Sequence, residues 1–81
     1  MSYTKTAVMI STQVCPFCVK AKAMLTDHGY DIIEIKAGQD IPMDAILPLS
    51  GRTSVPQIYI DGQHIGGSDD LEVWLENQAK Q

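Results

Sequence analysis

The first third of the chain carries a strand, a helix and a second strand in close succession, and this order restricts the fold more than any other feature. A short apolar run within residues 6–11 is typical of a strand that is buried on both faces. Apolar residues then recur at helical spacing over residues 16–28, Gly29 is placed as a stop, and residues 30–35 predict a second strand. Two strands joined through a helix are expected to be parallel neighbours in one sheet. The carboxyl end of the first strand therefore leads into Cys15 and the helix.

The middle of the chain predicts a loop and one short helix. Residues 36–42 have the composition of a loop, and residues 43–49 are expected to be helical, with Pro48 and Gly51 stopping the helix.

The last third predicts a hairpin and a terminal helix. Residues 57–60 alternate as a strand does, an Asp-Gly pair follows as a two-residue turn, and a return strand begins at His64. Ser68 or Asp69 is expected to cap the last helix, and Glu72 stands three residues after Asp69, as in a capping box. We find no repeat or linker, so the sequence predicts one domain over residues 1–81.

Composition excludes several classes of partner. The 81 residues carry a formal net charge of -4, which argues against nucleic acid and anionic membranes, because proteins that bind phosphate groups usually cluster Lys and Arg. The apolar run near the start is too short for a signal peptide, and no stretch reaches the roughly 18 apolar residues of a membrane span. We therefore expect a soluble, cytoplasmic protein.

The two cysteines, Cys15 and Cys18, could form a structural staple, a zinc site or a redox couple. A disulfide across so short a loop removes little entropy from the unfolded chain, so it would stabilise the fold weakly. A zinc site needs four ligands, and the two histidines, His28 and His64, have no paired ligand spacing. A redox couple fits the position at a helix start best, and no metal site is expected.

The position of the pair assigns a role to each thiol. Cys15 would lie at the helix N-terminus, where free N–H groups and the helix dipole lower a thiol pKa from about 8.5 to roughly 3.5–7.5. We therefore expect Cys15 to be the nucleophile and Cys18, one turn inside the helix, to be the resolving thiol. Pro16 suits the first helical turn because its missing N–H would have been unpaired there.

Two motifs and the order of the elements together resemble a dithiol glutaredoxin of the thioredoxin fold. The motifs are "CPFC" at 15–18 and "TSVPQIYIDGQHIGGSDDL" at 53–71. The resemblance implies an α/β fold, a four-stranded mixed sheet flanked by three helices, and a cis peptide bond between Val55 and Pro56 that faces the cysteines. It also implies glutathione as the reductant and no bound cofactor.

The resemblance implies a glutathione site at the second motif. The backbone of Val55, next to Ser54, would pair with glutathione as an added strand does. Gly67, Ser68 and Asp69 would hold the γ-glutamyl carboxylate at a helix N-terminus, and Asp70 would pair with the ammonium group.

Three positions depart from the family pattern. Thr12 stands where many glutaredoxins have a Lys that meets the glycine carboxylate of glutathione, and Met43 stands where Gln or Arg is frequent. Thr12 would still lie at the glutathione site, but the sequence predicts weak glutathione binding unless Arg52 or Lys20 compensates for the two missing contacts. Phe17 replaces a frequent Tyr, and it would either form an apolar docking surface beside the disulfide or pack at the helix start.

The predicted activity is the reduction of protein disulfides and glutathionylated thiols through a reversible disulfide between Cys15 and Cys18. Family analogy offers ribonucleotide reductase as one client, and a monomer is expected. Two alternatives stay open. One is a redoxin that thioredoxin reductase reduces directly, and the other is a homodimer that binds a [2Fe-2S] cluster through Cys15 and glutathione.

Overall fold

The computed structural model describes residues 5–79, which form eight helical and strand elements. The first four and last two residues of the expected domain, and with them part of the segment judged too short for a signal peptide, lie outside the described residues. The elements follow the order β1 (Thr6–Ser11), α1 (Pro16–Asp27), β2 (Asp31–Lys36), the 3-10 turn η1 (Met43–Ala45), α2 (Ile46–Ser50), β3 (Gln57–Ile60), β4 (Gln63–Gly66) and α3 (Ser68–Ala79).

The strands form one mixed sheet in the order β2-β1-β3-β4. β1 pairs with β2 in parallel, as the strand-helix-strand order predicts, and with β3 in antiparallel orientation. β3 and β4 form the predicted hairpin around the Asp61-Gly62 turn. The predicted fold class, a four-stranded mixed sheet with three helices, is confirmed.

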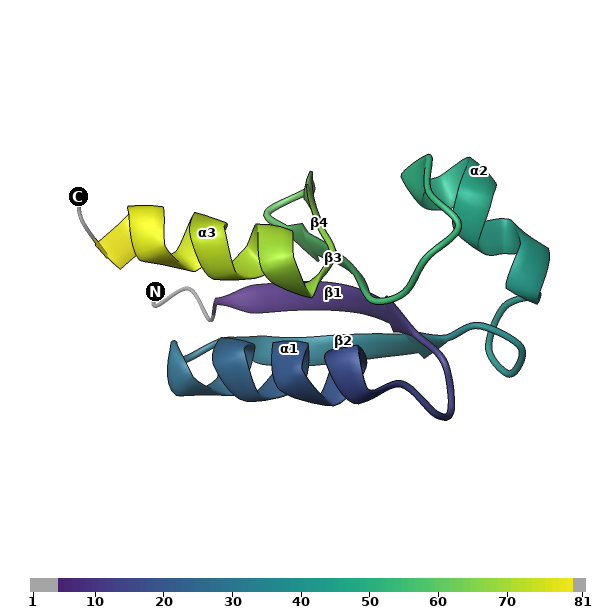
Figure 1. Cartoon of the computed structure of the whole chain (residues 1–81), viewed down its shortest axis with the longest axis horizontal. Helices are drawn as coiled ribbons and strands as arrows, with labels where there is room; N and C mark the ends of the chain where they lie inside the picture. Colours follow the sequence, from purple (N-terminus) through teal and green to yellow (C-terminus); the bar gives the residue numbers. More distant parts are fainter. Residues whose placement is uncertain (1–4, 80–81) are drawn as a thin grey trace.

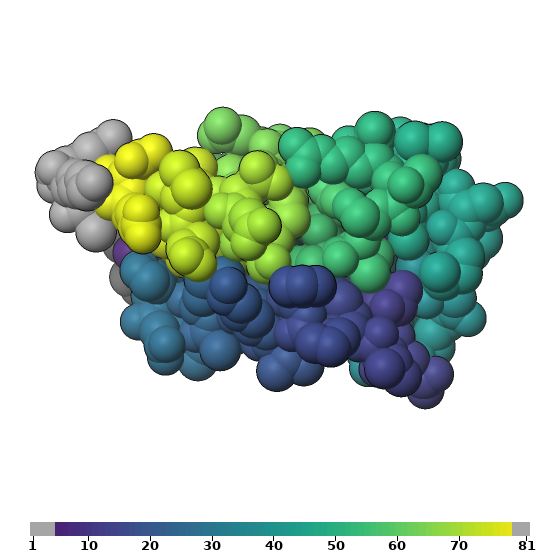
Figure 2. All heavy atoms as spheres, in the orientation of Figure 1, coloured from purple at the N-terminus to yellow at the C-terminus, as the bar shows by residue number. Residues whose placement is uncertain are grey.

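Helices cover the two faces of the sheet unequally. α1 and α3 lie side by side against one face, and α2 lies apart from them beyond the carboxyl end of β1 (Figure 1). The larger core forms between these two helices and the sheet and includes Met9, Leu25, Ile58 and Leu71, all fully buried. Figure 2 shows the outer surfaces of α1 and α3 in contact along their length.

The second face is covered only near the carboxyl end of β1. There Ile46 of α2 packs against Ile10 and Ala37. Val8, farther back on the same strand, is only half-buried, and Ile33 of β2 is exposed. The expectation that β1 is buried on both faces therefore holds only for its last residues, because α2 is too short to reach farther along the sheet.

The middle helix corrects one expectation. Pro48 does not stop the helix but lies in its first turn, where a missing N–H costs no hydrogen bond. Gly51 ends α2 with a φ of 79°, and its N–H donates to the carbonyl of Leu47 at 2.7 Å. This left-handed C-cap is the type of stop that glycine favours.

A polar network fixes β2 against β1 and α1. The Ser11 hydroxyl donates to Glu34 at 2.6 Å, and the Lys22 ammonium donates to the same carboxylate at 2.9 Å. The hydrogen bond from Ser11, followed by that from Lys22, holds the pKa of Glu34 below its ordinary value. Because Ser11 directly precedes the loop to Cys15, this network anchors the start of that loop. Among residues 5–79, no helix is long and apolar enough to cross a lipid bilayer.

Candidate active site

The cysteine pair lies at the start of α1, after the short loop that follows β1. Cys15 is the N-cap of α1 with extended backbone angles, and Pro16 takes the first helical position. The two sulfurs are bonded as a disulfide, with Cα atoms 5.2 Å apart. The Cys18 N–H lies 3.2 Å from the Cys15 sulfur, so the backbone directs a hydrogen-bond donor at that atom.

The two sulfurs differ in access. Cys18 is 3% exposed and belongs to the larger core, whereas Cys15 is half-buried at its edge. A thiol that approaches from solvent therefore reaches Cys15 first. This difference follows from the helix, because a residue one turn inside α1 turns toward the sheet while the N-cap stays at the rim.

Pro56 and Val55 form one wall of the site. The peptide bond between them is cis, as the family resemblance implied. Within residues 5–79, neither the N–H nor the C=O group of Val55 has a backbone hydrogen-bond partner. Both groups are therefore free to pair with an extended ligand.

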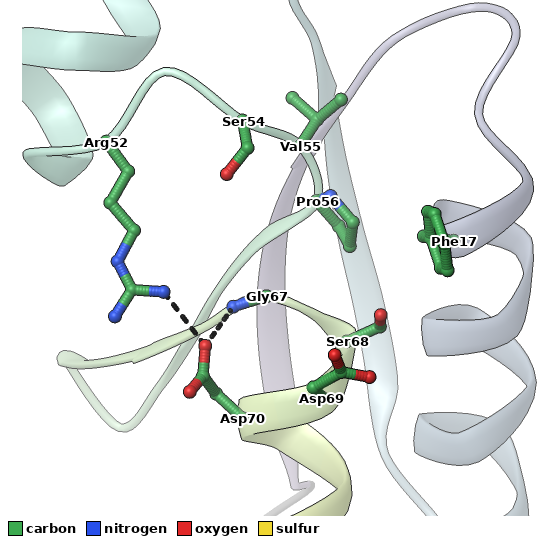
Figure 3. Close-up of a pocket in the computed structure, with 9 residues that line it drawn as sticks. All are labelled: Phe17, Arg52, Ser54, Val55, Pro56, Gly67, Ser68, Asp69 and Asp70. Carbon is green, nitrogen blue, oxygen red and sulfur yellow. Dashed lines mark hydrogen bonds and ion pairs between the residues drawn. The ribbon is translucent and has the colours of Figure 1, made fainter.

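A pocket of about 210 Å³ opens beside this wall, and we name it the α3 pocket. Phe17 lies on its α1 side, Arg52 on the opposite side, and the start of α3 forms its floor (Figure 3). Its lining residues are Phe17, Arg52, Ser54, Val55, Pro56, Gly67, Ser68, Asp69 and Asp70. Phe17 is 60% exposed, so it forms surface beside the disulfide and is not packed into the core at the helix start.

Asp70 organises the charged end of the α3 pocket. Its carboxylate accepts from Arg52 at 2.8 Å and from the Gly67 N–H at 3.0 Å (Figure 3). The hydrogen bond from Arg52, followed by that from Gly67, holds the pKa of Asp70 below its ordinary value. Asp70 is therefore a fixed anion in this part of the site.

The same contacts correct the expected helix cap. α3 begins at Ser68, so Gly67 is the N-cap, and its carbonyl accepts from the Leu71 N–H at 2.9 Å. The carboxylate that reaches back to the cap N–H is Asp70, not Glu72, and Glu72 instead pairs with Lys20 at 3.5 Å. Asp69 and Glu72 thus form no capping box, because the helix starts one residue before the Asp69 cap that the box requires.

Buried polar side chains hydrogen-bond to residues that line the α3 pocket. The Ser68 residue is 6% exposed, whereas Asp69 is exposed at the surface of the pocket. Gln57 is fully buried, and its amide donates to the Ser54 carbonyl at 2.9 Å and to the Ser54 hydroxyl at 3.2 Å. The other end of that amide is 2.8 Å from His64. No local sequence pattern signals this link, because Gln57 occupies an ordinary strand position.

Thr12 lies apart from the other predicted ligand residues, in a second pocket of about 390 Å³ that we name the Met43 pocket. Residues just before Cys15 form one side of it, and the loop after β2 and Met43 form the other. Its lining residues are Thr12, Gln13, Val14, Ala37, Gly38, Gln39 and Met43. The described structure therefore divides the predicted site between two pockets. Arg52 and Lys20 pair with Asp70 and Glu72, and neither lines the pocket that contains Thr12.

Metal ligands are not gathered in the described part of the chain. Within residues 5–79, no three His, Cys, Asp or Glu side chains lie close enough together to hold a metal ion.

Comparisons with known proteins give consistent results. The sequence model of the glutaredoxin family matches residues 3–65. Glutaredoxin 3 of Escherichia coli is 47% identical over 60 residues, which are 73% of this chain and 72% of that protein. The crystal structure of a buckwheat glutaredoxin-glutathione complex is similar with a TM-score of 0.78 and 27% identity, over 91% of this chain and 71% of that one.

A second relative has a different organisation. The hybrid peroxiredoxin hyPrx5 of Haemophilus influenzae is 55% identical over 61 residues, which are 75% of this chain. The chain spans only 25% of that protein. A segment similar to this chain therefore occurs within a larger protein that is named a peroxiredoxin.

Proposed function

This chain belongs to the glutaredoxin family of thiol-disulfide oxidoreductases, and we propose that it uses glutathione to reduce protein disulfides and glutathionylated thiols. The observation that carries the proposal is a half-buried, accessible Cys15 on the same face of the domain as a charged pocket whose lining includes Phe17, two residues after Cys15, and the free backbone of Val55. A disulfide substrate can thus reach one sulfur while its polar groups find partners nearby.

Cys15 is the nucleophile and Cys18 the resolving thiol. The Cys18 N–H at 3.2 Å and the N-cap position support a stabilised thiolate at Cys15. Pro16 fixes the first turn that holds this geometry. Burial of Cys18 restricts external attack to Cys15, and the Cα separation of 5.2 Å is within the range of a disulfide.

The reaction proceeds by three types of thiolate attack. The Cys15 thiolate attacks a substrate disulfide, forms a mixed disulfide and releases the first substrate thiolate. The Cys18 thiolate then attacks the Cys15 sulfur, which releases the second substrate thiolate and leaves the Cys15–Cys18 disulfide. A glutathione thiolate attacks Cys15 and frees Cys18, and a second glutathione attacks the bound glutathione sulfur. Two glutathione molecules are thus oxidised to one disulfide for each substrate disulfide reduced.

The α3 pocket binds the γ-glutamyl end of glutathione. The N–H groups at the start of α3, at Ser68 and Asp69, would bind its carboxylate, and Asp70 would bind its ammonium group. Gly67 allows close approach, while Ser54 and Val55 form the facing wall. The Val55 backbone would pair with the cysteine part of glutathione, and Pro56 holds that backbone beside Cys15.

A comparison of two reductants tests the proposal. The oxidised protein is mixed with glutathione or with thioredoxin reductase and NADPH, and alkylation of the freed thiols is followed by mass. We expect glutathione to reduce the disulfide and a glutathionyl adduct to form on Cys15 in the Cys18→Ser variant. Reduction by the reductase alone, without that adduct, would contradict glutathione dependence and favour a redoxin with a protein donor.

The relative from Haemophilus influenzae supports one class of client. Because a similar segment occurs within a hybrid peroxiredoxin, a separate peroxiredoxin is a candidate substrate of this chain. Ribonucleotide reductase is a further candidate by family analogy. Glutathione-dependent peroxide reduction in a mixture of this protein and a peroxiredoxin, absent with the Cys15→Ser variant, would support the first candidate.

We further propose that the protein acts as a cytoplasmic monomer with no bound cofactor. In a reducing compartment, cellular thiols reduce the Cys15–Cys18 disulfide again after each reaction. Light scattering of the reduced protein tests the monomer. A dimer with the visible absorption of an iron-sulfur cluster, formed in the presence of glutathione, would contradict it.

A further inference from the structure

The Met43 pocket is lined in part by the three residues that directly precede Cys15, it shares no lining residue with the α3 pocket, and its lining residues are all uncharged. Met43 is half-exposed, and its side chain lies so close to Gly38 that an added Cβ there would be 3.3 Å from the sulfur. Thr12, Gln13 and Gln39 contribute neutral polar side chains. Among the described residues, none of these three side chains has a hydrogen-bond partner. The pocket thus combines an apolar side with free neutral donors and acceptors.

The positive charges of the described chain are used elsewhere. Four of the five Lys and Arg residues within positions 5–79 contact a partner outside the Met43 pocket: Lys5 lies over the Tyr30 ring, Lys20 pairs with Glu72, Lys22 pairs with Glu34, and Arg52 pairs with Asp70. The fifth, Lys36, directly precedes the lining residue Ala37 but does not itself line the pocket. The charged residues that follow lining residues directly in the sequence are acidic, namely Asp40 after Gln39 and Asp44 after Met43. A carboxylate in this pocket would therefore lose hydration without gaining a cation.

We propose that the Met43 pocket receives a neutral peptide group, so that this protein prefers thiol substrates whose chain continues as an amide beyond the cysteine part. The inference rests on the proposed use of the α3 pocket for the γ-glutamyl end. Thr12, Gln13 and Val14 of the Met43 pocket directly precede Cys15, so a substrate bonded to Cys15 with its γ-glutamyl end in the α3 pocket can extend its other end toward the Met43 pocket. The α3 pocket offers Arg52, Asp69 and Asp70 to a charged end, whereas the Met43 pocket offers only Thr12, two glutamines and apolar surface.

The chemistry of glutathione makes this preference measurable. Its γ-glutamyl end carries a carboxylate and an ammonium group, and its glycine end carries a second carboxylate. Converting the glycine carboxylate to a primary amide removes the charge that would face the Met43 pocket and leaves the other end unchanged. In a protein substrate, the next peptide group takes the place of that amide.

The test uses the full chain with Cys18→Ser and two disulfides, in which a fluorescent thiol is joined to glutathione or to glutathione amide. The Cys15 thiolate attacks the glutathionyl sulfur, a bond between Cys15 and that sulfur forms, and the reporter leaves as a fluorescent thiolate. We expect the amide to react several-fold faster than the free acid. Equal rates, or a preference for the free acid, would overturn the inference.

A lysine placed in the Met43 pocket sharpens the test. Thr12→Lys should accelerate the free acid by about tenfold, the effect of one charge-assisted hydrogen bond, and change the amide by less than about twofold. Val73→Lys adds the same charge at an exposed position of α3 outside both pockets and should leave the ratio of the two rates unchanged. An unchanged ratio in a folded Thr12→Lys variant would also overturn the inference, and the parent ratio tests it without that variant.

A third disulfide separates this inference from the proposed function. It joins the same reporter to 2-mercaptoethanol, which has neither charged end. If both glutathione disulfides react no faster than this one, the proposed glutathione site is wrong and the inference fails with it. If both react faster but the free acid is preferred, only the inference fails.

Discussion

The α3 pocket and the Met43 pocket differ in how their lining residues are held. In the α3 pocket, the Asp70 carboxylate is fixed by Arg52 and by the Gly67 N–H, so its charge has a defined position. In the Met43 pocket, Met43 and the glutamine side chains have no such anchors among the described residues. Preorganised charge favours one geometry of a charged ligand, whereas unanchored neutral side chains tolerate several. The α3 pocket should therefore select for one charged end group, whereas the Met43 pocket should select only for the absence of charge.

Two glycines, one that contacts Asp70 of the α3 pocket and one that lines the Met43 pocket, offer the strongest way to break this comparison. Gly66 has a φ of 124°, and an added Cβ would come 2.8 Å from the Asp70 Cγ atom. Gly38 has a φ of 87°, and its added Cβ would meet only the flexible end of Met43 at 3.3 Å. We expect Gly66→Ala to lower the free energy of unfolding by about 3 kcal/mol, because it combines strain with displacement of Asp70.

Gly38→Ala should cost about 1–2 kcal/mol, since it adds backbone strain alone. Urea unfolding followed by circular dichroism measures both values. Equal losses would mean that the contact between Gly66 and Asp70 adds nothing to the strain, and that the α3 pocket is no more tightly constrained than the Met43 pocket.

Removing one negative charge beside each pocket should affect activity on one side only. Asp70→Asn keeps an acceptor for the Gly67 N–H but loses the charge proposed to bind the substrate ammonium group. We expect it to raise the KM for glutathione by about tenfold, or more, as for a hydrogen bond to a charged group. Asp44→Asn removes the same charge beside the Met43 pocket and should change KM by less than about twofold. Similar effects of the two variants on steady-state kinetics would contradict the proposed division of the site.

Acid should weaken the α3 pocket before it affects the Met43 pocket, whose lining has no titratable group. Arg52, followed by Gly67, lowers the folded-state pKa of Asp70. Asp70 therefore stabilises the fold above the unfolded-state value of about 3.9, and this contribution is lost as the pH falls through the folded-state pKa. Asp70 is half-exposed, so the contribution to stability is small.

Replacing Arg52 tests the cause of that shift. The hydrogen bond from Arg52 lowers the pKa of Asp70 more than the hydrogen bond from the Gly67 N–H does. In the Arg52→Gln variant, the pKa of Asp70 should therefore rise toward its ordinary value, because the positive charge of the donor is removed. Carbon chemical shifts of the Asp70 carboxyl group, followed against pH, measure the change. An unaltered titration would show that the Gly67 N–H alone sets the pKa.

Local sequence patterns predicted the helices and strands well, because each of these elements is specified by residues close together in the sequence. The apolar run before Cys15, the helical spacing after it and the Asp-Gly turn each act within a few residues. Pro48 misled because proline stops a helix only beyond its first turn, and the pattern did not show where α2 begins. The same uncertainty of helix start misassigned the cap of α3.

The site could be predicted only in part, because contacts between distant segments have no local signal. The chemistry of the cysteine pair follows from its place at a helix start, whereas the cis bond before Pro56 and the ligand residues came from the family resemblance. The pairing of Arg52 with Asp70 joins residues 18 positions apart, and it was not foreseen. Nor did the sequence reveal that Thr12 lies in a different pocket from Ser54 and Asp70.

The smallest expected effect concerns the most exposed apolar residue in each pocket. Phe17 is 60% exposed in the α3 pocket and Val14 is 90% exposed in the Met43 pocket. Replacing either with serine should change the free energy of unfolding by less than about 0.5 kcal/mol, because neither side chain is buried in the fold. Urea unfolding of the two variants measures this. A clearly larger loss for Phe17→Ser would mean that its ring holds the start of α1, and that the apolar side of the α3 pocket is structural and not a surface kept open for substrates.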